Sequence, residues 1–86
     1  MPWVREPRKT RTVTLLVTGN PDDPYTLMIE PWGMTYELDG SRRMFVDIDL
    51  ADGEFPELVA WPGGLSIYAA GRAVTRDTFG KVLHEF

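Results

Sequence analysis

Glycine or proline interrupts this chain about every ten residues, and the segments between them alternate apolar and polar side chains. These segments are rich in Val, Ile, Thr, Tyr and Phe, which favour strands. Because successive side chains of a strand point to opposite faces, the period of two predicts short antiparallel strands. We therefore expect an all-β fold, a small antiparallel barrel or sandwich-like sheet of six or seven short strands joined by tight Gly/Pro turns.

The expected strands lie between these turn residues and run over Thr10–Thr18, Tyr25–Glu30, Met34–Leu38, Met44–Leu50, Leu58–Trp61 and Leu65–Ala69. The clearest alternation is in Met44–Leu50, where Val46 and Ile48 share one face and Asp47 and Asp49 share the other. One face of this strand is expected in the core and the other in water.

The segment after Gly71 fits two structures. Phe79, Val82, Leu83 and Phe86 have helical spacing and follow Asp77, which predicts a short C-terminal helix, whereas the Asp77–Gly80 segment also fits the turn of a final hairpin. Gly80 weakens a helix by about 1 kcal/mol relative to alanine. The hairpin is therefore favoured.

The third and fourth expected strands allow a prediction of register. A two-residue Asp39-Gly40 loop would place the apolar residues of the two strands on opposite faces of a hairpin, because a slip of one residue inverts the faces of a strand. A loop with an odd number of residues restores the match. We expect such a loop, with Gly40 at a positive φ.

Two proline turns carry tryptophan, Pro31-Trp32-Gly33 and Trp61-Pro62-Gly63-Gly64. Proline has no N–H to donate to a sheet, so both turns should end strands. Trp61 alternates with Val59 as a core residue does, and we expect it to be structural. Trp32, at a turn close to Tyr36 and Arg43 in the sequence, is expected to make a surface contact.

The length and composition predict one small β domain over residues 10–86, preceded by a basic and flexible arm over residues 1–9. The chain has no cysteine and one histidine, His84. A disulfide, a thiolate nucleophile and a zinc site built from cysteines or several histidines are therefore excluded. This composition is compatible with a reducing compartment, and a cytoplasmic location is expected.

Charge is distributed unevenly along the chain. Residues 1–11 carry a net charge of +3, with Arg5, Arg8, Lys9 and Arg11 as the basic residues, and the other residues carry −7. An acidic body repels phosphate, so binding to nucleic acid would depend on these four residues. No segment approaches the about 18–20 apolar residues that span a bilayer, and no membrane association is expected.

Carboxylates occur in three arrangements that resemble functional sites. Residues 47–54 resemble a calcium loop, but the fifth, sixth and twelfth positions of such a loop are Ala51, Asp52 and Leu58. The pairs Asp47 with Asp49 and Glu54 with Glu57 have a spacing that any acidic strand shows. The sequence shows no nucleophile with a histidine base and an acid to orient that base, which a catalytic triad requires. We expect no catalytic residues, no metal site and no cofactor.

Aromatic residues exceed the needs of so small a core, since they make up 12% of the chain. Phe45 shares its expected face with Asp47, and Tyr68 lies opposite Ile67, so both are expected to be exposed. Exposed aromatic side chains often mark an interface. The expected binding residues are Trp32, Tyr36, Arg42, Arg43, Phe45, Asp47 and Tyr68.

These features predict a small non-enzymatic interaction protein that binds another protein, or a second copy of itself as a homodimer, through an aromatic strand face. One alternative is a barrel resembling SH3 or OB folds that binds single-stranded nucleic acid through Arg5, Arg8, Lys9, Arg11 and exposed aromatics. Another is a module for a small ligand or carbohydrate, built on Trp32 and Trp61.

Overall fold

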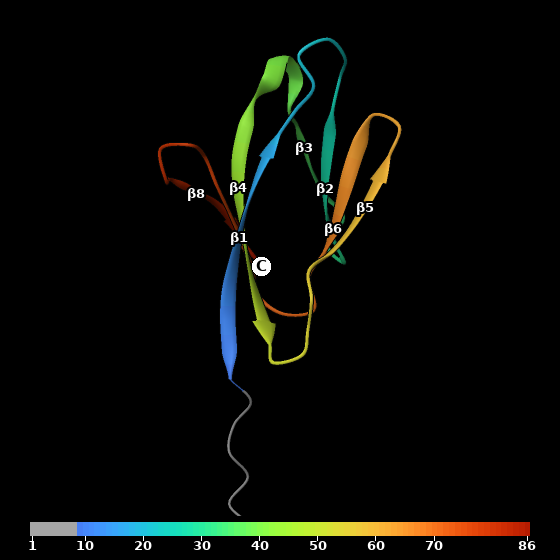
Figure 1. The fold of residues 1–86 in the computed structure, drawn as a ribbon. Coiled ribbons are helices and arrows are strands. Elements are labelled where there is room, and N and C mark those ends of the chain that lie inside the picture. Colours follow the sequence, from blue (N-terminus) through green and yellow to red (C-terminus); the bar gives the residue numbers. More distant parts are fainter. Residues whose placement is uncertain (1–8) are drawn as a thin grey trace, which may run out of the picture.

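The computed structural model describes residues 9–86 and shows an all-β fold of two four-stranded sheets (Figure 1). The elements are β1 (Thr10–Thr18), β2 (Thr26–Glu30), β3 (Met34–Glu37), the 3₁₀ turn η1 (Asp39–Ser41), β4 (Arg43–Ala51), β5 (Glu57–Trp61), β6 (Gly64–Tyr68), β7 (Ala73–Arg76) and β8 (Val82–Glu85). The predicted all-β class is confirmed, but the described residues form eight strands instead of six or seven.

Sheet A has the strand order β1-β4-β7-β8, and every neighbouring pair is antiparallel. Its longest ladder joins β1 to β4, from the pair Thr10 and Ala51 to the pair Thr18 and Arg43. The β7–β8 pair contains an irregularity in register between Thr75 and Arg76. The final hairpin is thus confirmed, and the alternative of a C-terminal helix is wrong, because Val82–Glu85 pairs with β7.

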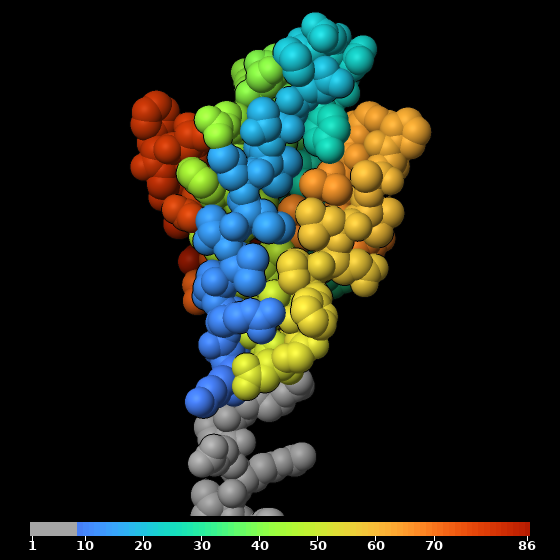
Figure 2. Space-filling view, in the orientation of Figure 1, coloured from blue at the N-terminus to red at the C-terminus, as the bar shows by residue number. Residues whose placement is uncertain are grey.

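Sheet B has the strand order β3-β2-β6-β5. Its β2–β3 and β5–β6 pairs are antiparallel, whereas β2 and β6 run parallel, which a purely antiparallel fold does not include. The strand orders leave β1, β8, β3 and β5 at the ends of the two sheets, so the barrel alternative is wrong. Figure 2 shows the β5–β6 hairpin on one side of β1 and the β7–β8 hairpin on the other.

The hydrophobic core lies between the two sheets and takes its side chains from the inward positions of both. Its buried members are Val17, Leu27, Ile29, Leu38, Met44, Val46, Ile48, Leu50, Ile67, Ala69 and Ala73. The alternation in β4 is confirmed, because Met44, Val46, Ile48 and Leu50 are buried and the residues between them are half-buried. Burial of these inward side chains is what stabilises so small a sandwich.

The predicted hairpin between the third and fourth strands is wrong. β3 pairs with β2, β4 pairs with β1 and β7, and η1 carries the chain from sheet B to sheet A. Gly40 in this connection has the expected positive φ of 65°. Two strands that face one core from opposite sheets must also match their apolar faces, so matched faces do not by themselves specify a hairpin.

The turns at the two prolines are confirmed as strand ends. β2 ends at Glu30, before Pro31, and β5 ends at Trp61, before Pro62. Pro62 and Gly63 link the terminal pair of the β5–β6 hairpin, Trp61 with Gly64, and Gly63 has a φ of 84°. Only glycine adopts this conformation freely, so the Pro-Gly order specifies this turn.

The predicted arm lies largely outside the described residues, and Arg5 and Arg8 fall within that part of it. Lys9 is described, and its carbonyl oxygen accepts a hydrogen bond from the Asp52 N–H at 3.0 Å. No helix within residues 9–86 is long and apolar enough to cross a membrane.

Candidate functional site

The outer surface of sheet B carries a cluster of apolar side chains, which we call the sheet B face and define as Met28, Val59, Trp61 and Tyr68. Leu27, Ile29 and Ile67 point into the core, so the residues that alternate with them point away from it. The pairing places Met28 beside Ser66 and Ser66 beside Val59 across three neighbouring strands. Val59, Trp61 and Tyr68 are 44%, 37% and 43% exposed.

Trp61 is held on this face by the residues across the β5–β6 hairpin. Its Nε1–H donates to Ser66 Oγ at 3.2 Å. Its ring lies where a side chain at Gly64 would project, because a Cβ there would overlap two of the ring carbons. Glycine at position 64 therefore lets the indole lie flat against the sheet, half-covered and half-open to solvent.

Carboxylates surround the sheet B face. Tyr68 lies between Glu30 of β2 and Glu57 of β5 in the registers of the two ladders. Glu37 follows on β3 and accepts a hydrogen bond from Thr26 Oγ1 at 3.0 Å. An apolar centre with a charged border is the usual composition of a protein-binding patch, and negative borders favour partners with basic residues around an apolar anchor.

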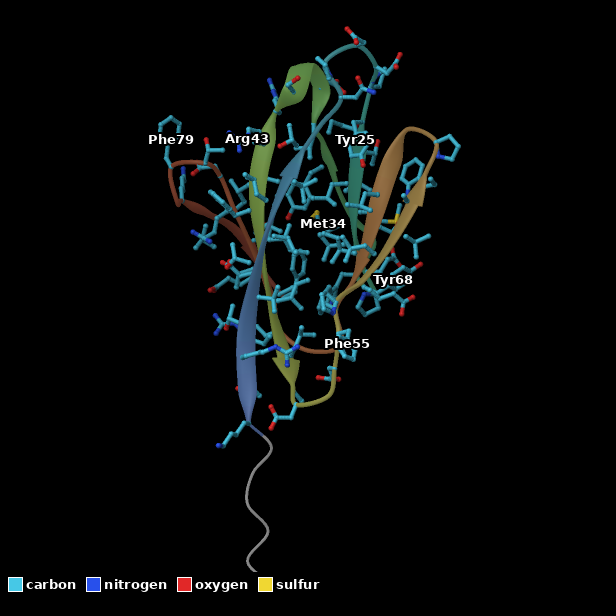
Figure 3. All side chains as sticks on the ribbon, in the orientation of Figure 1. Tyr25, Met34, Arg43, Phe55, Tyr68 and Phe79 are labelled. Carbon is cyan, nitrogen blue, oxygen red and sulfur yellow. The ribbon has the colours of Figure 1, made fainter. Side chains whose placement is uncertain are left out.

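Tyr68 is the expected binding residue that the structure places on this face, and Figure 3 labels it. The expectation that Trp61 and Val59 belong to the core is wrong, since both lie on the outer face and are exposed. Leu58 and Ala60 occupy the inward positions of β5, opposite Ile67 and Leu65. Both faces of this strand are apolar, so alternation alone does not separate them. Glu57 shares the face of Val59 and Trp61 and is the signal that identifies the outer one.

Trp32 lies at the β2–β3 turn and is half-exposed. Its ring stacks on that of Phe86, with 4.8 Å between the ring centroids and 21° between the planes. Trp32 and Trp61 lie at opposite ends of sheet B, because Trp32 follows Glu30, which pairs with Tyr68, whereas Trp61 pairs with Gly64. The structure therefore does not bring the two tryptophans together as one platform.

Tyr36, Arg42 and Arg43 come together at a groove of about 730 Å³. The groove lies beside β3, η1, the start of β4 and the β7–β8 turn, and its wall is lined by Thr35, Tyr36, Glu37, Leu38, Ser41, Arg42, Arg43, Met44, Asp77, Thr78 and Leu83. The lining thus includes both cationic and anionic side chains around apolar ones. Figure 3 labels Arg43 at this end of β4.

Within this groove the Tyr36 side chain points to sheet A. Its hydroxyl lies 2.8 Å from Thr75 Oγ1 and 2.8 Å from His84 Nδ1. Burial raises the pKa of Tyr36 above its ordinary value, and the hydrogen bond with Thr75 opposes this effect in part. Tyr36 therefore joins the two sheets as a neutral phenol, a role that the sequence did not indicate.

Phe45 and Asp47 lie together on the outer face of sheet A, as their alternation predicted. Arg76 donates to Asp47 through Nε at 2.6 Å and through Nη2 at 2.9 Å, and its guanidinium lies 5.0 Å from the centre of the Phe45 ring. The hydrogen bond with Arg76 is the largest cause of a lowered pKa for Asp47, and Thr14 contributes in the same direction. Phe45, Asp47 and Arg76 are therefore already partnered with one another on this face.

Two exposed aromatic residues lie in connections between strands and not on the face of a sheet. Phe55 is in the β4–β5 connection and Phe79 is in the β7–β8 turn, and both are mostly exposed (Figure 3).

Of the residues expected to bind nucleic acid, Arg11 donates through Nη2 to the Glu54 carbonyl oxygen at 2.9 Å. Residues 9–86 contain no group of three or more His, Asp or Glu side chains arranged to hold a metal ion.

Comparisons with protein-family models, with curated proteins and with solved structures find no match to this chain.

Proposed function

We propose that this protein is a small non-enzymatic interaction module that binds a partner protein through the sheet B face. The observation that carries the proposal is the exposure of Val59, Trp61 and Tyr68 side by side on a sheet, without an element of residues 9–86 covering them. Apolar side chains gathered on a surface favour association, because binding removes them from water.

The sheet B face is the better candidate of the two sheet surfaces. On sheet A, Asp47, Arg76, Thr14 and Phe45 are already engaged with one another, so a partner would have to break these contacts. On sheet B, no hydrogen bond or ion pair within residues 9–86 holds the exposed Val59 and Tyr68 side chains, and little has to be rearranged when a partner binds. Glu30 and Glu57 favour a partner with lysine or arginine beside its apolar residues.

Affinity capture with the tagged protein, in nuclease-treated lysate of its source organism, tests the proposal. Tyr68→Ala should reduce the yield of captured partner at least about tenfold, since the loss of one aromatic anchor costs on the order of 2 kcal/mol. Leu16→Ala is the matched control, because Leu16 lies on sheet A and is 44% exposed. Equal capture by the two variants, with both of them folded, would contradict the proposal.

Nuclease treatment separates this function from the nucleic-acid alternative, in which capture is lost with the nucleic acid. The alternative of a small-ligand module stays a prediction, and the groove beside Tyr36 is the surface that suits it.

A further inference from the structure

β5 is one of the two end strands of sheet B, and within residues 9–86 one of its edges is free. It pairs with β6 on one side, and residues 9–86 supply no strand on the other side. All five of its residues are exposed. A free strand edge presents N–H and C=O groups that form hydrogen bonds readily with another strand.

The β5 edge has less protection against pairing than the other end strands, and Glu57 at its start is its single charged residue. Four of its five residues are apolar, Leu58 to Trp61, and it contains neither lysine nor proline. The other end strands differ from it. β8 has an irregular register and carries Glu85, which forms an ion pair with Arg72. β3 has only four residues and ends in Glu37, and β1 carries Arg11 and four threonines. Among these edges, β5 is therefore the one suited to strand addition.

We propose that β5 pairs antiparallel with β5 of a second copy of this chain, about a two-fold axis at Val59, so that sheet B continues across two molecules. The proposal goes beyond the function proposed above, since it concerns the edge of the sheet and not the binding of another protein to its face.

The residues that flank β5 select this register. Pro56 and Pro62 each lie three positions from Val59, so in a pairing centred there they face each other just outside the five paired residues. A pairing centred on Leu58 places Pro56 opposite Ala60 of the second copy, and one centred on Ala60 places Pro62 opposite Leu58. Because proline has no N–H to donate, both shifted registers lose a position of the ladder.

The register centred on Val59 also matches side chains and charges. Val59 meets Val59 of the second copy, Leu58 meets Ala60, and Glu57 meets Trp61. Residues two apart share a face, so the outer positions of one copy continue those of the other. The glutamate of each β5 faces an indole and not its own equivalent. Although the whole chain carries a net charge of −4, no like charges lie opposite each other in the ladder.

The expected dimer is weak. Two strands of five residues bury less surface than the about 1,200 Å² of a standard interface. Association should therefore be observed as a concentration-dependent increase in mass by sedimentation equilibrium, within a series that reaches about 1 mM.

Charge exchange at the two-fold axis tests the register. Val59→Lys and Val59→Glu each place like charges opposite each other in the dimer, and each should weaken self-association at least about tenfold. An equimolar mixture of the two variants places lysine opposite glutamate and should restore association to within about threefold of the wild type. The side chain at position 59 is on the surface, and circular dichroism confirms that each variant is folded.

The matched control is Val82→Lys in β8, another end strand, where the valine is 46% exposed. This variant should associate as the wild type does. The proposal is overturned by a wild type that stays monomeric at about 1 mM, by a Val59→Lys chain that still associates with itself, or by a mixture that does not associate.

The outcomes remain separate from those for the proposed function. If the wild type is monomeric while Tyr68→Ala still loses a captured partner, pairing of β5 with its own copy fails and the binding face stands. If the mixture of the two Val59 variants associates while Tyr68→Ala captures as much partner as Leu16→Ala does, pairing of β5 with its own copy stands and the binding face fails.

Discussion

The Tyr36 hydroxyl is a single group that connects side chains of three strands. It comes from β3 of sheet B and lies within hydrogen-bond distance of Thr75 in β7 and His84 in β8. Thr75 is fully buried, and its Oγ1 also accepts the His84 N–H at 3.2 Å. A polar group inside a small sandwich is tolerated because each of its partners is present.

Tyr36→Phe should lower the free energy of unfolding by about 1–2 kcal/mol, because it removes one hydroxyl from this network and leaves the ring in place. Unfolding in urea measures the change. Tyr25→Phe is the control: Tyr25 also packs against the core, but its hydroxyl has no hydrogen bond within residues 9–86. Equal stability of the two variants would show that the Tyr36 hydroxyl contributes nothing.

At the scale of elements, the outer face of sheet A is stabilised by a charge pair between neighbouring strands. Asp47 of β4 accepts two hydrogen bonds from Arg76 of β7, and Thr14 of β1 donates a third. The pKa of Asp47 is lowered in the folded state by these donors, Arg76 first. Folding is therefore favoured more strongly where Asp47 is ionised.

The sign of this linkage predicts an acid dependence. The contribution of Asp47 is complete above the ordinary aspartate pKa of about 4 and is lost as the pH falls through the lowered pKa of the folded state. Asp47→Asn should unfold at lower urea concentration than the wild type near pH 7, and the difference should shrink below about pH 4. Urea midpoints over this pH range measure it. Arg76→Gln should reduce the same acid dependence, and an unchanged dependence in both variants would contradict the assignment.

At the scale of the whole molecule, the two sheets are joined by aromatic contacts on the side where β3 and β8 end the strand orders. Trp32 at the β2–β3 turn stacks on Phe86, which follows β8, and the Phe86 N–H donates to the Ala73 carbonyl oxygen at 2.8 Å. The last residue of the chain thereby connects the edge of sheet A to the turn of sheet B.

A double-mutant cycle measures this contact. Trp32→Ala and Phe86→Ala should each destabilise the protein, and their effects should be coupled by about 0.5–1.5 kcal/mol, as for other aromatic pairs. The pair Trp32→Ala with Phe79→Ala is the control, because Phe79 is almost fully exposed in the β7–β8 turn, and its coupling should be close to zero. If the destabilising effects of Trp32→Ala and Phe86→Ala are additive, the stacking contact does not contribute to joining the two sheets.

The sequence predicted the local elements well, and for a physical reason. Alternation along β4 follows from its own residues, since each side chain is either covered by the core or exposed to water. Turns at Pro31 and Pro62 follow from a missing N–H and a fixed φ. Strand β1 was predicted with the bounds Thr10 and Thr18 that the structure shows.

The candidate site was less predictable. Tyr68 was identified on an exposed face, but Trp61 and Val59 were assigned to the core, because both faces of β5 are apolar. Tyr36 was expected at the surface, yet its partners Thr75 and His84 are 39 and 48 positions away in the chain. Neighbours along the chain give no signal for the position of Tyr36. For β5, the one such signal is Glu57, which marks the outer face.

The amino-acid sequence by itself determined the all-β class, the turns, and which residues of most strands share a face, because these properties depend on neighbours along the chain. The tertiary structure alone decided that β3 and β4 lie in opposite sheets, that β2 and β6 run parallel, and that β5 ends sheet B among residues 9–86. A strand can satisfy the same pattern of burial beside several different partners. The choice between them depends on the packing of the whole core and not on any one segment.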